Sequence, residues 1–164
     1  MGGFSEDSSP VSPGGIQRGG ATFTQQPNGR WDVKGEGFAL SIQFGPDELA
    51  LVDPVHARAL QQAQKVYLTH EGGKDYLNTL ADFYQNMRAF VPVFLACVED
   101  GPGCENLPLK TCADAGNGVA VAVVKIAEQP RVSLEGDCYT LEGEALFLNK
   151  AVDRLLLSFV GVTL

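Results

Sequence analysis

The chain has 164 residues, of which 45% are hydrophobic, and its 20 acidic and 12 basic side chains give a formal charge of −8. Such a length and composition are typical of one soluble globular domain with a core of its own. An acidic chain without a cluster of Lys or Arg lacks the charge pattern of a nucleic-acid binder, so we expect no nucleic-acid partner.

Residues 1–20 are rich in Gly, Ser and Pro. They carry too little apolar surface to order themselves, so we expect a flexible arm followed by a single domain over residues 21–164. The arm has neither the basic nor the apolar region of a secretory signal. We therefore take the cytoplasm as the default location.

Alternating apolar and polar residues between 21 and 44 predict a meander of two or three strands. Asn28-Gly29 is a strong signal for a tight turn within it. Trp31 is the only tryptophan. We interpret it as a packing residue, with a role as a binding anchor as the alternative.

A helix is predicted over residues 54–70, because Asp53 is a good N-cap and apolar residues follow at helical spacing. A second helix is predicted over 74–91, and the short linker favours an antiparallel helix pair. Pro92 must end or kink that second helix. For 93–98 we favour a kinked helical continuation over a buried strand.

The segment 99–118 is irregular and long for a compact domain, which is typical of functional or disordered loops. Among the three pairings that four cysteines allow, we favour a Cys104–Cys112 disulfide under oxidising conditions. The alternative is four free thiols, partly in the core. The cysteine spacing fits no metal-binding template, so no metal site is predicted.

The stretch 119–128 is apolar on both faces, which predicts a central strand. Two strands, 131–135 and 138–142, should follow as a hairpin around a Gly-Asp turn. A helix from 144 to about 160 completes the chain, with an apolar arc much wider than one sheet requires. It is either sandwiched inside the domain or covered by another subunit. Its central charges would be costly in lipid, so we expect no membrane insertion.

Together these elements predict an α+β fold. It has an N-terminal β-meander, an antiparallel helix pair, an antiparallel β-hairpin region and an apolar C-terminal helix packed on the sheet, which we expect to be largely antiparallel. No motif of a nucleophile, a phosphate-binding loop or a metalloprotease occurs, so the sequence predicts no catalytic residue and no cofactor. His56 and His70 lie too far apart on the predicted helix to share a metal ion. We interpret each as a helix-edge residue, with an acid or base role as the alternative.

Our leading hypothesis is a non-enzymatic, structural or interaction subunit of a homo-oligomer or larger assembly. Its partners would be copies of the same chain or other subunits. The C-terminal helix would supply the interface through Leu148, Val152, Leu156, Phe159 and Val160. The alternative is a small enzyme or ligand-binding protein with a pocket between the 54–91 helix pair and the 99–118 loop, where His70 and Asp114 would act.

Overall fold

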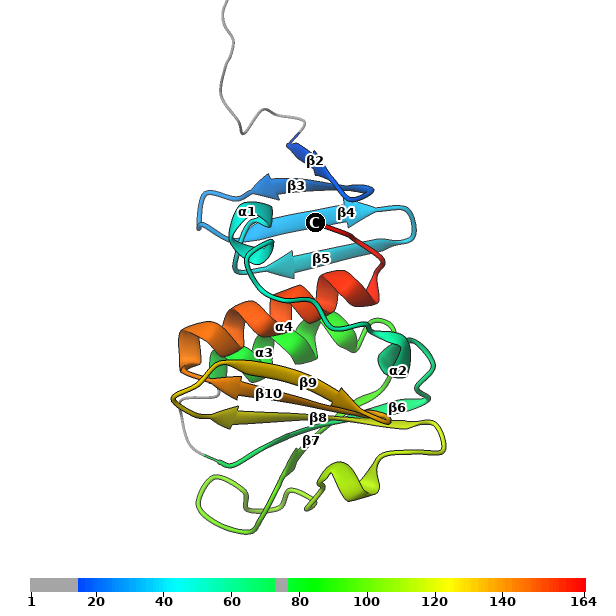
Figure 1. Cartoon of the computed structure of the whole chain (residues 1–164), viewed down its shortest axis with the longest axis vertical. Helices are drawn as coiled ribbons and strands as arrows, with labels where there is room; N and C mark the ends of the chain where they lie inside the picture. Colours follow the sequence, from blue (N-terminus) through cyan, green and yellow to red (C-terminus); the bar gives the residue numbers. More distant parts are fainter. Residues whose placement is uncertain (1–14, 73–76) are drawn as a thin grey trace, which may run out of the picture.

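The computed structural model describes residues 15–72 and 77–164, and these form three layers (Figure 1). A four-stranded antiparallel sheet lies on one side and a five-stranded mixed sheet on the other. The two longest helices lie between the sheets. The mixed α+β fold that the sequence predicts is confirmed.

The first sheet is the predicted meander, made of β2 (Ile16–Arg18), β3 (Ala21–Gln25), β4 (Trp31–Gly35) and β5 (Phe38–Ile42). Its first strand belongs to the segment that we assigned to the flexible arm, of which residues 1–14 lie outside the described residues. Gly19 and Gly20 have φ values of 59° and 87°. Two consecutive residues with positive φ make the tight turn that joins paired strands, so this Gly-Gly pair starts the sheet earlier than predicted.

The helix predicted over 54–70 is wrong. Two short helices, α1 (Pro46–Leu49) and α2 (Arg58–Gln61), are followed by the strand β6 (Lys65–His70). Val66 and Leu68 are fully buried, whereas Lys65 and Tyr67 between them are only partly covered. This two-residue alternation fits a strand, and the strand is stabilised by pairing with neighbours on both sides.

The second predicted helix is confirmed as α3 (Leu77–Met87), and residues 73–76 lie outside the described residues. The helical continuation after Pro92 is wrong, because β7 (Val93–Cys97) is a strand parallel to β6. The unit β6–α3–β7 is thus a crossover, in which a helix returns the chain so that the next strand can pair in parallel.

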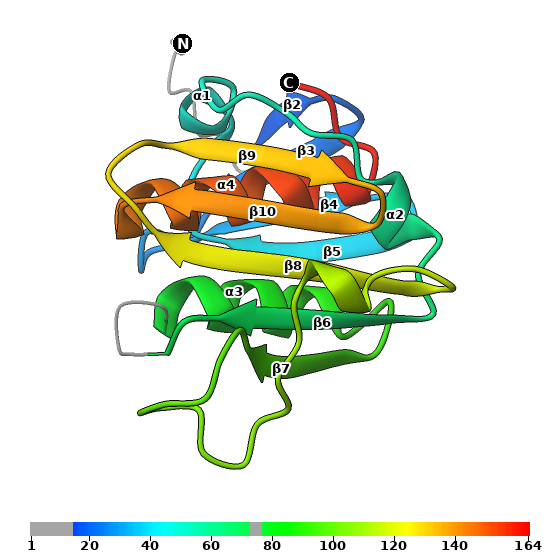
Figure 2. The same cartoon turned by 60° about the horizontal axis from the view of Figure 1, so that its bottom comes forward.

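The second sheet has the order β7-β6-β8-β10-β9 (Figure 2). The strand β8 (Val119–Ile126) is central, as predicted, and β9 (Arg131–Glu135) and β10 (Cys138–Gly143) form the predicted hairpin. Our expectation of a largely antiparallel sheet is wrong, since β6 pairs in parallel with β7 and β8, and β8 pairs in parallel with β10. Only the hairpin is antiparallel.

The C-terminal helix α4 (Ala145–Phe159) lies beside α3 between the two sheets (Figure 1). Its apolar side chains join a single core with residues of both sheets, such as Phe23 and Val33 on one side and Val66 and Tyr139 on the other. Sandwiching within the chain therefore explains the wide apolar arc. Among the described residues, no helix is long and apolar enough to cross a membrane.

The segment 99–118 lies over the face of the five-stranded sheet that is turned away from the helices (Figures 1 and 2). Two disulfides hold it there, Cys97–Cys104 and Cys112–Cys138. The predicted Cys104–Cys112 pairing is wrong. Cys138 on β10 lies in the small outer core with Val121 and Val123, and the short 3-10 helix η2 (Cys112–Asp114) brings its partner over that core.

We predict that peptide mapping of the unreduced protein will recover these two pairs. Replacing Cys112 and Cys138 together by Ser should cost about 3.5 kcal/mol of unfolding free energy, against about 2.4 kcal/mol for Cys97 and Cys104. The order follows from loop entropy, because the bonded cysteines are 26 and 7 residues apart respectively. Urea unfolding of both double variants measures the difference. A larger loss for the shorter loop would contradict it.

Candidate functional site

Two consecutive charged residues of α4 lie inside the protein. Asp153 is 0% exposed and Arg154 is 6% exposed. Consecutive side chains of a helix point about 100° apart, so the two contact different surroundings. Asp153 contacts the end of β5, whereas Arg154 lines a pocket beside the segment 54–61. Charged groups are seldom buried unless they are paired, so each of the two needs its own explanation.

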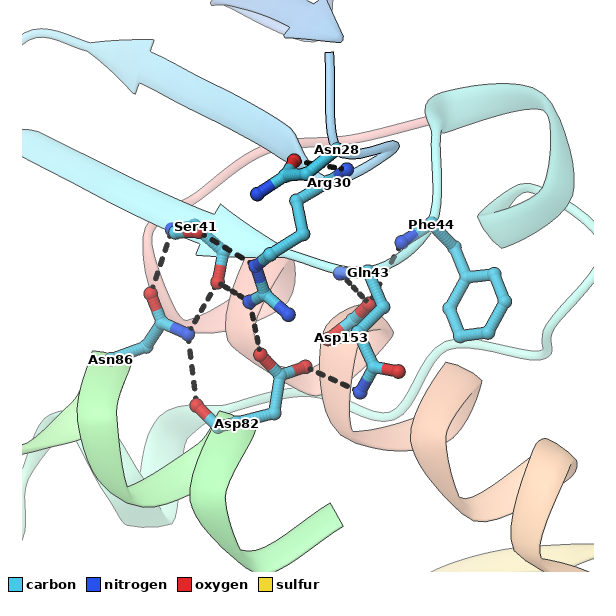
Figure 3. A network of polar contacts seen from close by, with 8 residues as sticks. All are labelled: Asn28, Arg30, Ser41, Gln43, Phe44, Asp82, Asn86 and Asp153. Carbon is cyan, nitrogen blue, oxygen red and sulfur yellow. Dashed lines mark hydrogen bonds and ion pairs between the residues drawn. The ribbon is translucent and has the colours of Figure 1, made fainter. Parts of the chain in front are cut away.

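Asp153 belongs to a polar network between α4, α3 and the first sheet (Figure 3). Its Oδ2 accepts hydrogen bonds from the backbone N–H groups of Gln43 and Phe44, at 2.8 and 3.1 Å. Burial raises the pKa of Asp153 well above its usual value. A hydrogen bond with Asp82 and the negative charge of that residue raise this pKa further. Asp153 therefore favours its protonated, uncharged form.

Asp82 on α3 connects this pair to the first sheet. Its Oδ1 accepts from Nη2 of Arg30 at 2.9 Å, and its backbone oxygen accepts from the side-chain amide of Asn86. That amide also donates to the backbone oxygen of Ser41. These bonds fasten β5 and the turn before β4 to the helix layer (Figure 3). We interpret the network as structural, because the groups of Asp82 and Asn86 are satisfied by other protein groups.

Arg154 has no comparable set of partners. Its Nε and Nη1 are enclosed by protein without a hydrogen-bond partner. Within the described residues, no carboxylate lies within 4.0 Å of the guanidinium. Burial lowers the pKa of Arg154, but a guanidinium starts so high that it stays charged at neutral pH. The fold therefore holds a buried positive charge without a counter-charge, which is an unfavourable arrangement for a purely structural group.

The pocket that Arg154 lines has a volume of about 450 Å³. Further polar side chains around it belong to His56, Arg58, Gln61, Ser158 and Thr163. Two hydrogen bonds of 2.9 Å hold its walls. Tyr139 Oη donates to the backbone oxygen of His56, and Gln61 Nε2 donates to that of Phe159. The pocket is thus formed before any ligand enters, and its charged side chains are basic within an acidic chain.

The residues that we expected in the alternative pocket do not line this one. His70 ends β6, where its Nδ1 accepts from the backbone N–H of Gly72 at 2.9 Å and its Nε2 lies 3.9 Å from Cys97 Sγ. Burial lowers the pKa of His70. Asp114 accepts a bond from the backbone N–H of Thr111 and completes the cap of η2. Asp114 thus bonds within its own turn, whereas His70 contacts Gly72 and, on β7, Cys97.

The residues that we expected at a subunit interface lie largely inside the chain. Leu148, Val152 and Leu156 are at most 1% exposed. Phe159 and Val160 are partly buried against the core, and the ring of Phe159 contacts that of Phe90 edge-on, with centroids 5.2 Å apart. The first three side chains have no surface left for a second chain.

In the sequence, Arg154 is only one of the central charged residues of the last predicted helix. The signal available was an Asp-Arg pair in the middle of an apolar stretch, Val152 to Leu157. A helix that is apolar almost all round is buried, so a charge within it must be paired or must face a cavity. Sequence alone does not show which of the two applies.

Comparison with known proteins gives no further assignment, since no family model, no curated protein and no solved structure matches the chain. Within the described part of the chain, no three His, Cys, Asp or Glu residues gather in a way that could hold a metal ion.

We predict that Asp153→Asn will change the pH dependence of stability. The folded-state pKa of Asp153 is raised, so the folded chain keeps a proton that the unfolded chain releases above about pH 3.8. Stability contributed by this group is therefore full below that pH and is lost as pH rises toward the folded pKa.

The asparagine variant keeps an oxygen for Gln43 and Phe44 and adds a neutral donor toward Asp82. It should equal or exceed the parent in urea unfolding at pH 7, and should lose that advantage near pH 4. Asp53→Asn, at an exposed position, is the matched control and should give the same difference at both pH values. A variant that is less stable than the parent at pH 7 would contradict the raised pKa of Asp153.

Proposed function

We propose that the chain binds a small anionic ligand in the pocket of Arg154. The observation that carries the proposal is the guanidinium itself, buried with Nε and Nη1 unpartnered at the wall of a preformed pocket. A negative group in this pocket would supply the missing counter-charge. Bonds between a guanidinium and an anion are among the stronger ones in proteins, because both partners are charged.

The size and position of the pocket support this proposal. A volume of about 450 Å³ falls in the range of known small-molecule sites. The surrounding His56 and Arg58 are exposed, so they could attract an anion from solution without being neutralised by the fold. The proposal keeps the ligand-binding class that we inferred as the alternative from the sequence, but places the pocket between the 54–61 segment and the end of α4, without His70.

We predict that an anion of this kind raises the melting temperature in a saturable way, because a ligand that binds only the folded chain stabilises it. The probes are sodium phosphate, sodium acetate and sodium octanoate, compared with sodium chloride at equal ionic strength. At least one should raise the melting temperature of the parent but not that of Arg154→Met. Arg88→Met, at an exposed arginine directly after α3, should respond like the parent. An unchanged shift in Arg154→Met, or no shift with any probe, would contradict the proposal.

Assembly with other copies stays a second hypothesis, but the apolar arc of α4 no longer supports it, because both sheets cover that arc. We predict that Leu156→Ala lowers the unfolding free energy by about 2–5 kcal/mol, as a cavity in a core does. Its native mass by sedimentation should equal that of the parent. A change of mass without loss of stability would restore the interface role of the helix.

The disulfides also bear on location. Such bonds persist in oxidising compartments and are rare in reducing cytosol. We therefore propose that the chain works in an oxidising environment, in place of the cytoplasmic default.

A further inference from the structure

The pocket of Arg154 combines one buried charge with apolar walls. Val55, Ala57 and Val162 line it, together with the ring of Pro54. Ala57 and Val162 are 4% and 3% exposed, and both belong to the main core. Pro54 is exposed and Val55 half-buried, so a ligand that only neutralised the charge would leave their apolar surfaces in contact with water. A ligand with an apolar part would cover them and gain the hydrophobic contribution of that contact.

The charges around the pocket favour an anion with a single negative charge. Arg154 is the one buried charged side chain among the lining residues. Arg58, the other arginine, is exposed, so solvent and salt screen its charge. The pocket also lies at the C-terminal end of α4, where the partial charge of the helix is negative and opposes a second negative charge.

Backbone donors do not supply more anion-binding groups at this end of the helix. The N–H groups of Val160, Gly161 and Val162 already donate to the carbonyl oxygens of Leu156, Ser158 and Leu157. A phosphate monoester, with up to two charges and three terminal oxygens, would find only one buried cation and would depend on exposed side chains for the rest. A carboxylate has one charge, which a single guanidinium compensates.

We infer that the ligand is a monocarboxylic acid with an apolar body, whose carboxylate meets Arg154 and whose hydrocarbon part lies against Pro54 and Val55. This inference rests on the proposed function and specifies the class of its ligand. The class is an alkyl or aryl carboxylate. A phosphate ester is the alternative ligand class against which the test decides.

The test is titration calorimetry of the full chain with acetate, butyrate, hexanoate and octanoate, and with inorganic phosphate, at constant ionic strength. Affinity should rise about fourfold for each methylene that the pocket covers. Octanoate should therefore bind far more tightly than acetate or phosphate. Octanol, which has the same chain without the charge, should bind at least tenfold more weakly than octanoate.

Three variants separate the pocket from the rest of the surface. Arg154→Met should remove octanoate binding, whereas Arg88→Met, at an exposed arginine outside the pocket, should change it less than threefold. Val55→Thr replaces a methyl by a hydroxyl of similar size, so it should weaken octanoate and leave acetate unchanged. Circular dichroism and the melting temperature show whether each variant keeps the fold.

The outcomes distinguish this inference from the function on which it rests. Phosphate binding that is tighter than octanoate binding and is lost in both Arg154→Met and Arg58→Met would overturn the carboxylate class and keep an anion site. Equal affinities for octanol and octanoate would overturn the carboxylate class, because the site would then bind only the apolar part of the ligand. If none of the acids or phosphate binds, the inference and the proposed function both fail.

Discussion

The structure depends on the burial of one helix between two sheets. α4 packs against the five-stranded sheet that precedes it in the chain and against the meander of residues 16–42 (Figure 1). Such a helix must be apolar over most of its circumference, and Leu148, Leu155 and Leu157 satisfy that need with exposures of at most 1%. The same packing shields a charge in the middle of the helix from most of the solvent.

Two charges nevertheless occur there, and the fold treats them differently. Asp153 receives two backbone hydrogen bonds, and burial beside Asp82 raises its pKa, so the carboxyl group favours its uncharged form. Arg154 cannot lose its charge at neutral pH and has no acidic neighbour within ion-pair distance among the described residues. The first group joins the layers of the protein. The charge of Arg154 has no counter-charge within that part of the chain and could be compensated by a bound ligand. This contrast is the basis of the functional proposal.

The elements that the sequence predicts correctly are those whose apolar residues recur with an unambiguous spacing. β8 is apolar on both faces, and α4 continues its pattern for four turns. β6 was missed because its alternation covers only six residues and overlaps a helical spacing that begins earlier. Its pairing with β8, some 54 residues later, is a tertiary effect that overrides local preference. Disulfide pairing has the same origin, since Cys138 meets Cys112 only through the sheet. Arg154 could not be identified, because the absence of a partner is a property of the folded chain.

The most direct test of this account is the unfolding free energy of Arg154→Met, measured by urea in a buffer without organic anions. Methionine keeps much of the volume and apolar contact of the arginine stem but removes the charge. If the guanidinium serves a ligand and not the fold, the variant should be at least as stable as the parent. A loss of about 3 kcal/mol or more would mean that the fold depends on that charge, as it does when a paired buried ion is removed, and would contradict the account.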